Sequence, residues 1–93
     1  MPKFLVTHPI DPPLSREALT PFAIKVKAAL SPDAYWVSSY LQLNDKGEVT
    51  KVFSDWDAKD AESIRKTCAN SIPDFPASEG ILPVAIIHGE KYR

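Results

Sequence analysis

Cysteine, glycine and histidine are scarce in this sequence, whose 93 residues include one cysteine, three glycines and two histidines. A single cysteine excludes a disulfide within the chain, which is typical of a reducing compartment, so we expect a cytoplasmic protein. The glycines stand far apart, which excludes a glycine-rich phosphate-binding loop. Paired cysteines, paired histidines at helical spacing and EF-hand spacing are all missing, so we expect no tightly bound structural metal. The Gly-x-Ser-x-Gly motif of serine hydrolases is missing too.

Strong net charge and long apolar runs are also absent. The formal net charge at pH 7 is −1, which offers no electrostatic reason for binding nucleic acid or an anionic membrane. No apolar run approaches the roughly 20 residues of a membrane span, and the N-terminus MPKFLV lacks the apolar region of a signal peptide. We expect one domain over residues 1–93, with 88–93 as a loose tail. So short a chain buries a modest core, and association would add to its stability.

A β-hairpin organises the chain. Two β-rich runs, YWVSSYLQL (35–43) and EVTKVFSDW (48–56), flank Asn44–Gly47, whose Asn, Asp and late Gly are typical of a short hairpin loop. If Leu43 faces Glu48, three further pairs lie opposite each other: Tyr40 and Lys51, Ser38 and Phe53, Trp36 and Asp55. One face then carries rings and polar groups, here called the ring-lined group: Trp36, Ser38, Tyr40, Lys51, Phe53 and Asp55. The other face is more aliphatic and is expected to pack on helices, although a one-residue bulge would exchange the partners on one strand.

Two further strands are predicted outside the hairpin. KFLVT (3–7) and ILPVAII (81–87) are short apolar runs with β-branched residues. The proline-rich stretch IDPPL (10–14) is predicted to be a loop that follows the first strand.

Two helices are predicted, over 15–30 and 58–69. Ser15 is expected to cap the first, and Pro21 either kinks it or marks a second start, because proline suits the first helical turn. Asp57 is expected to cap the second helix.

The element order is therefore β-α-β-β-α-β, the α+β ferredoxin-like arrangement. Right-handed crossovers then predict an antiparallel sheet in the order 4-1-3-2, with both helices on one face. The last strand becomes an edge that is apolar on both faces, and the ring-lined group lies on the face without helices. Both features favour a homodimer formed through the helix-free sheet face.

Three pieces of the sequence carry a family resemblance: YWVSSY, the W-D-A-x-D-A-E-x-I run from Trp56 to Ile64, and FPASEGILPV. With the element order, they resemble the dimeric α+β barrel superfamily, and more narrowly a small bacterial family of uncharacterised domains with a nickel-binding branch. That family often has a histidine in the second helix followed by glycine, where this chain reads Lys66-Thr67-Cys68-Ala69-Asn70. The resemblance implies a dimer whose sheets pack face to face. Because the family's helix histidine is missing, we expect no cofactor beyond a weakly bound nickel or other divalent metal, for which the residues themselves offer His8 as the candidate ligand.

His8 lies just after the first predicted strand. Imidazole serves as a base or a metal ligand near neutral pH, while the alternative is an exposed residue at the start of a loop. If Phe4 and Val6 share the helix-free face, His8 reaches a cavity there. If Leu5 and Thr7 occupy that face instead, His8 points elsewhere.

The ring-lined group is the best candidate for a ligand site, because rings supply apolar walls and polar heads orient a small molecule. The alternative is dimer packing, with Lys51 and Asp55 satisfying each other. Two functions stay open beside small-molecule or metal binding. One is a cofactor-free barrel enzyme, monooxygenase- or isomerase-like, in which His8 and Asp55 act as acid or base and Tyr40 as donor. The other is a purely structural dimerisation domain.

Overall fold

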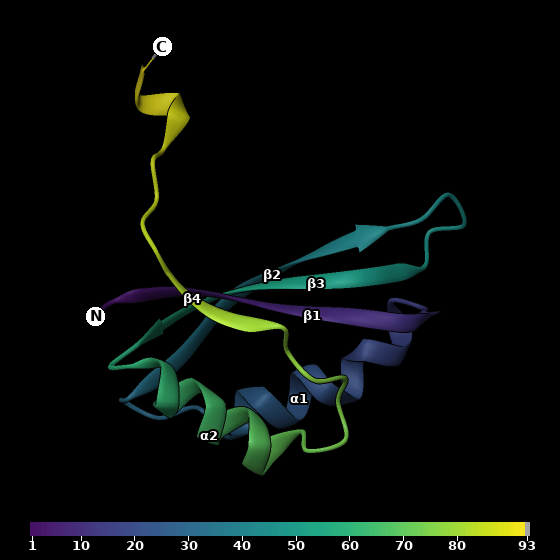
Figure 1. The fold of residues 1–93 in the computed structure, drawn as a ribbon, viewed down its shortest axis with the longest axis horizontal. Coiled ribbons are helices and arrows are strands. Elements are labelled where there is room, and N and C mark those ends of the chain that lie inside the picture. The colour runs from purple at the N-terminus through teal and green to yellow at the C-terminus, as the bar shows by residue number, and fades with distance from the viewer. Residues whose placement is uncertain (93) are drawn as a thin grey trace.

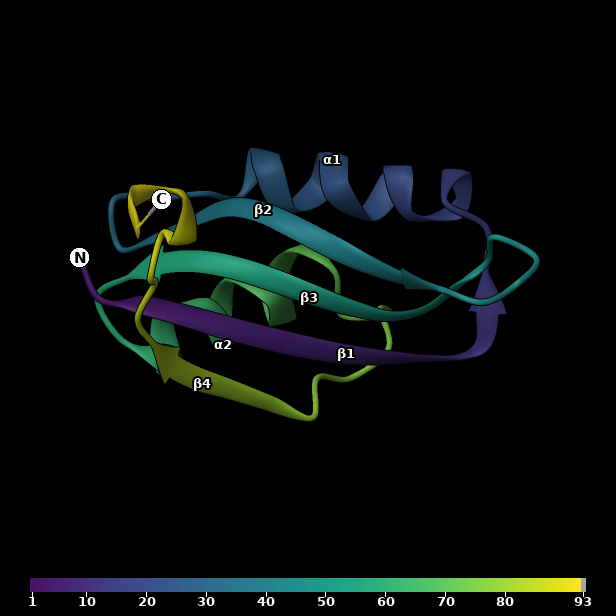
Figure 2. The ribbon, with the colours of Figure 1, turned by 90° about the horizontal axis from the view of Figure 1, so that it is seen from above.

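One antiparallel sheet in the order β2-β3-β1-β4 forms one layer of the molecule, and two helices form the other. The computed structural model describes residues 1–92. Along the chain the elements are β1 (Lys3–Leu14), the 3-10 helix η1 (Glu17–Leu19), α1 (Thr20–Ala28), β2 (Ala34–Leu43), β3 (Val49–Ala58), α2 (Ala61–Ser71), β4 (Gly80–Val84) and the 3-10 helix η2 (Gly89–Tyr92). Both helices lie on the same face of the sheet (Figure 1; Figure 2). The predicted ferredoxin-like fold and its strand order are confirmed.

The predicted hairpin is formed by β2 and β3, and a single side chain organises its turn. The Asn44 carboxamide oxygen accepts the backbone N–H groups of Lys46 and Glu48, each at 3.0 Å. Gly47 follows with a φ of 77°, in the left-handed region that favours glycine.

The register within the hairpin differs from the prediction. Trp36 lies opposite Trp56, Val37 is an extra residue on β2, and pairing resumes with Ser38 opposite Asp55. The later pairs are Tyr40 with Phe53, Gln42 with Lys51 and, after a second irregularity, Leu43 with Val49. The predicted partners Tyr40–Lys51, Ser38–Phe53 and Trp36–Asp55 are therefore wrong. A bulge changes which side chains share a face, and here it turns Trp36 toward the helices.

The prediction of a loop at 10–14 is also wrong, because β1 continues to Leu14 with a shift in its pairing to β3 after Pro9. Ile10 is 3% exposed and packs with Val49 and Val52, so apolar burial holds this proline-rich stretch against the sheet. At the other end of the chain, β4 stops at Val84, three residues earlier than predicted.

The first helix has the two starts that its sequence allows. Ser15 accepts the Ala18 N–H at 3.2 Å on its hydroxyl oxygen, beside the short turn of η1. Pro21 then lies in the first turn of α1. Backbone N–H groups of the first turn have no acceptor within the helix, so a proline there costs no helical hydrogen bond. The second-start interpretation of Pro21 is confirmed.

The second helix is capped by a different aspartate from the predicted one. Asp60 accepts the Ser63 N–H at 2.8 Å, whereas Asp57 belongs to β3 and lies on the sheet. The helix therefore begins at Ala61, three residues later than predicted. The Asp60 hydrogen bonds to Ser63 hold the pKa of that carboxyl below its usual value.

The buried residues between sheet and helices form two clusters. The larger lies under both helices and comprises Phe4, Val6, Val26, Ala34, Trp56, Ala58, Ile64 and Ile72. The smaller comprises Ile10, Val49 and Val52, and Phe75 packs against both clusters. Within residues 1–92, no helix has the length and apolar character needed to cross a membrane.

Candidate functional site

The structure divides the predicted site residues between the two faces of the sheet. Cross-strand neighbours share a face, and β1 places Leu5 opposite Asp55 and Thr7 opposite Phe53. The helix-free side, here called the open face, therefore carries Lys3, Leu5, Thr7, Ser38, Tyr40, Lys51, Phe53, Asp55, Asp57, Leu82 and Val84. Five of the six members of the ring-lined group lie there together.

Trp36 is the exception, and its predicted face is corrected. Its pairing with the buried Trp56 places it on the helix side of the sheet, against the larger core cluster. Its indole N–H donates to the Ser39 hydroxyl oxygen at 2.9 Å.

His8 also faces the helices, so the second of the two alternatives for β1 holds. It lies opposite Val52 and is 8% exposed, whereas Asp55 and Tyr40 lie on the open face. The sheet itself separates the imidazole from these two groups. The three candidates for acid–base catalysis therefore do not form one site within a single chain.

Ion pairs on the open face differ from the predicted Lys51–Asp55 pair. Lys3 lies 2.7 Å from an Asp55 carboxylate oxygen and 2.8 Å from one of Asp57, and these two contacts raise the pKa of the Lys3 ammonium group. Lys51 pairs with Glu79 and lies 5.5 Å from the centre of the Phe53 ring. The charges of this face are thus largely balanced within the chain.

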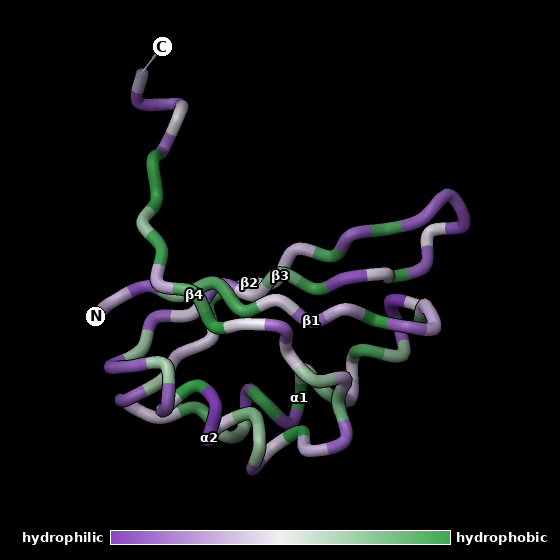
Figure 3. The backbone as a smooth tube through the Cα atoms, in the orientation of Figure 1, coloured by the Kyte–Doolittle hydropathy of each residue, from purple (hydrophilic) through white to green (hydrophobic). Residues whose placement is uncertain are grey.

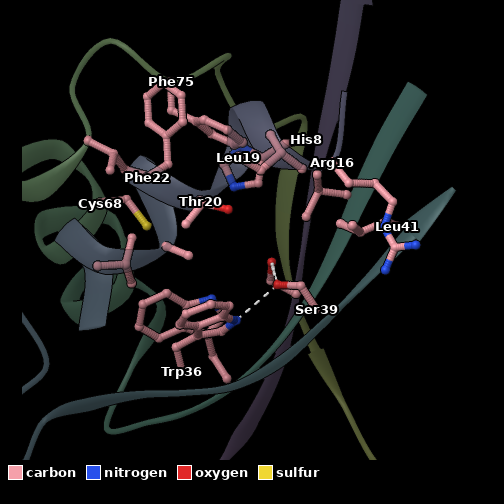
Figure 4. A pocket seen from close by; sticks show the side chains of 16 residues that line it. His8, Arg16, Leu19, Thr20, Phe22, Trp36, Ser39, Leu41, Cys68 and Phe75 are labelled. Atoms are coloured by element: carbon pink, nitrogen blue, oxygen red, sulfur yellow. Dashed lines mark hydrogen bonds between the residues drawn. The ribbon is translucent and has the colours of Figure 1, made fainter. Parts of the chain in front are cut away.

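A cavity of about 280 Å³ lies between the helices and the sheet, where the two core clusters meet; it is here called the interlayer cavity. Its walls come from η1, α1, α2, three strands and the loop before β4 (Figure 4). The lining side chains are mostly apolar or aromatic: Leu19, Phe22, Ala23, Val26, Trp36, Leu41, Val52, Trp56, Ile72 and Phe75, with polar groups from His8, Arg16, Thr20, Ser39, Ser54 and Cys68. This volume is close to the lower end of the roughly 300–1,000 Å³ found for small-molecule pockets.

A chain of hydrogen bonds lines the sheet side of the interlayer cavity. The Ser39 and Ser54 hydroxyl oxygens lie 2.8 Å apart, and Ser39 also accepts from Trp36. Either hydroxyl can donate to the other, and when Ser39 donates, the Ser54 hydroxyl proton is free for another acceptor. Thr20 lines the cavity from α1, and His8 lines it from β1, across the opening from Ser39 (Figure 4). Polar groups thus face the cavity from two sides.

His8 is held in one orientation. Its Nδ1 lies 2.9 Å from the Pro76 carbonyl oxygen, and its ring meets that of Phe75 edge to face at 5.0 Å between centres. Because a carbonyl oxygen only accepts, Nδ1 carries the proton, and the neutral ring keeps its lone pair on Nε2. Burial lowers the pKa of His8, although the Pro76 carbonyl opposes this effect. The imidazole is therefore a neutral acceptor in the cavity wall.

The groups around His8 do not make a divalent-metal site of the usual kind. Cys68 lines the same cavity, but burial raises the pKa of its thiol to about 11, which keeps it in the protonated form that binds metals poorly. Among residues 1–92, no three His, Cys, Asp or Glu side chains are grouped so as to hold a metal ion. Weak nickel binding at His8 stays a prediction that metal titration of untagged protein would test.

Sequence reasoning missed most of the cavity wall. Arg16, Thr20, Phe22 and Phe75 come from a helix and a loop, whose packing on the sheet follows no local pattern. One signal was available. Without a bulge, Trp36 would face Asp55, the residue next to Trp56, so a single extra residue on β2 is enough to pair the two tryptophans and bring them to the same face.

Comparison of the chain with protein-family models, with curated proteins and with solved structures finds no significant match.

Proposed function

We propose that this protein binds a small, mainly apolar molecule in the interlayer cavity. The observation that carries the proposal is a largely apolar cavity of about 280 Å³ between the two layers, which opens to solvent beside the exposed Arg16 and Thr20. An apolar cavity of about 150 Å³ is enough to bind a benzene-sized ligand, so this one has room for one or two rings.

The lining suggests the chemistry of the ligand. Aromatic walls favour a flat or branched hydrocarbon body, while the His8 Nε2 acceptor and the Ser54 hydroxyl favour a polar substituent that both donates and accepts. An alcohol, phenol or protonated acid fits that description. Among the described residues that line the cavity, His8 is hydrogen-bonded to the Pro76 carbonyl and to no hydroxyl or thiol group, so these residues support binding rather than turnover.

Tryptophan fluorescence provides a direct test, because both tryptophans of the chain line the cavity. We expect 1-naphthol to quench this emission and to bind more tightly than naphthalene, which has the same rings without the hydroxyl group. Isothermal titration calorimetry would supply the dissociation constants independently of the optical signal.

A matched pair of substitutions on α1 separates binding from unfolding. Ala23 lines the cavity, whereas Ala28 on the same helix is exposed. We expect Ala23→Leu to fill the cavity and abolish 1-naphthol binding while the fold is retained, and Ala28→Leu to bind as the wild type does. Equal binding by Ala23→Leu, or no binding of either probe to the wild type at millimolar concentration, would refute the proposal.

We propose as a second function that two copies associate through the open face. Large apolar side chains are uncovered there: Tyr40 is 69% exposed, Leu82 51% and Val84 37%. The charged groups around them are already paired within the chain, so burial of this face would leave few unpaired charges. Between two such sheets, Ser38, Tyr40, Phe53, Lys51 and Asp55 would line the ligand pocket expected from the sequence, which stays a prediction.

Sedimentation velocity over a dilution series tests this association. We expect a dimer for the wild type and a shift toward monomer for Tyr40→Asp, which places a charge in the interface. Ile24→Asp is the control, because Ile24 is 65% exposed on the helix side of the molecule. A wild type that stays monomeric at micromolar concentration contradicts the association.

A further inference from the structure

The chain after β4 leaves the body of the molecule. Residues 85–92, here called the C-terminal arm, rise from the end of β4 on the side opposite the helices (Figure 1). Viewed onto the open face, the arm stands over the end of the sheet near the N-terminus (Figure 2). Within residues 1–92, the arm forms no hydrogen bond or salt bridge with the rest of the chain; its one backbone bond joins Lys91 N–H to the His88 carbonyl at 3.0 Å.

The arm is apolar where it leaves the sheet. Ile86 is 48% exposed and Ile87 82% exposed, and the hydrophobic stretch stands clear of the body (Figure 3). Tyr92 near its end is 77% exposed. Exposed isoleucine side chains forgo the burial energy that apolar surface gains on leaving water, so a segment of this composition is suited to packing on another surface.

The position of the C-terminal arm indicates which surface it would pack on. The arm extends away from the helices, so it crosses the plane in which a second copy would meet the open face. A four-stranded sheet is only about 19 Å wide at ~4.8 Å per strand, and β4 pairs with β1 over five residues. Because a stable interface takes about 800 Å² from each partner, the sheet alone offers a small contact area, and the arm would enlarge it.

We infer that the C-terminal arm is an interaction arm that packs through Ile86 and Ile87 on a second copy of this chain. This inference rests on the proposed association through the open face and adds to it the segment that clamps the two copies together. In a twofold-symmetric dimer each arm reaches across the interface, so two arms act at once.

Truncation separates the arm from the sheet contact. A chain that ends at Val84 keeps all four strands and both helices. We expect its dimer dissociation constant to rise at least about a hundredfold, because the isoleucines of each arm together contribute about tenfold or more and the dimer contains two arms. Ile86→Ser with Ile87→Ser should act in the same direction, and the control Ile24→Ser should leave the dissociation constant unchanged.

The outcomes distinguish the two proposals. A monomeric wild type overturns the association and the arm inference together. A wild-type dimer that survives truncation with the same dissociation constant overturns the arm inference alone.

Cross-linking tests whether the arm reaches the other copy. A benzophenone attached at Ile87→Cys in a Cys68→Ser background should yield a covalent dimer on illumination, and the same label at Ile24→Cys should not. Cross-links confined to single chains, or formed only with other proteins in a lysate, would overturn packing on a second copy.

Discussion

The two faces of the sheet alternate along the same strands, yet they have opposite character. On the helix side, Phe4, Val6, Trp56 and Ala58 are nearly excluded from solvent. On the open face, the exposed Tyr40 and the half-buried Phe53 lie on the same surface as ion pairs that link β1, β3 and the loop before β4. Alternation along the strands alone produces the two sets of residues, but packing against the helices decides which set is buried and which stays exposed.

The two faces differ in the environment of their polar groups. The helix side gives a partner to the buried His8 and Ser54 and to the half-buried Trp36 indole, and no buried side-chain polar atom of residues 1–92 lacks one. The open face leaves its charges near water and pairs them with each other. A ligand site with a few directional groups belongs to the first environment, and an association surface belongs to the second.

Removing buried volume from the helix side should have the largest effect on stability. Ile64 on α2 is 0% exposed within the larger core cluster, so Ile64→Ala should lower the free energy of unfolding by about 2–5 kcal/mol. Leu82→Ala on the open face should cost less than about 1 kcal/mol in the monomer. Urea denaturation measures both. A Leu82→Ala cost that grows with protein concentration would place the partner on the open face.

The buried histidine should make the helix side sensitive to acid. Because its folded pKa is lowered, His8 contributes stability that is complete above its unfolded pKa of about 6.5 and declines as the pH falls toward the folded value. The wild type should lose up to about 1.4 kcal/mol per unit of pKa shift between about pH 7.5 and about pH 5. His8→Asn, whose amide can donate to Pro76, should lose less.

The control for that experiment is His88→Asn, because His88 is exposed in the C-terminal arm. It should follow the wild-type pH profile. Identical profiles for His8→Asn and the wild type would mean that burial does not perturb this imidazole.

Adjacent serines offer a smaller test of the same comparison. Ser39 hydrogen-bonds with Trp36 and Ser54 on the helix side, so Ser39→Ala should cost about 1–2 kcal/mol by leaving those groups without a partner. Ser38→Ala, one residue away on the open face, should stay within about 0.5 kcal/mol. Equal costs in thermal unfolding would show that the Ser39 hydrogen bonds to Trp36 and Ser54 add nothing measurable to the stability of the helix side.

The smallest effect is expected from the ion pairs of the open face. Lys3→Met removes the cation between Asp55 and Asp57, and we expect a cost of at most about 1 kcal/mol, because solvent screens such pairs. The cost should shrink in high salt. Lys59→Met, which loses only an exposed contact with Asp33 at 3.8 Å, should have no measurable effect. A larger cost for Lys3→Met that salt does not reduce would mean that the pair is shielded from water.

Local patterns predicted the frame of the fold well. The turn residues Asn44 and Gly47 marked the hairpin, and the second possible start at Pro21 marked α1. The cap of α2 was assigned three residues too early, because Asp57 and Asp60 both suit a helix start and only the length of β3 separates them.

The predicted site was only partly correct, because it depended on the register between β2 and β3. Five members of the ring-lined group do share a face, but Trp36 does not, and His8 lies behind the sheet from Asp55. One extra residue at Val37 accounts for the tryptophan. The two tryptophans were the one sequence signal for that bulge, which brings both indole rings to the helix side of the sheet.

What the sequence by itself determined is the order of strands and helices, the hairpin and its turn, and the presence of one apolar set and one mixed set of side chains. Those features follow from periodicity and turn chemistry, which act over a few neighbouring residues. Tertiary structure alone decided the bulge at Val37, the burial of His8, the interlayer cavity and the path of the C-terminal arm. Each of these depends on how segments distant in sequence pack together, and packing volume is a property of the assembled layers rather than of any one segment.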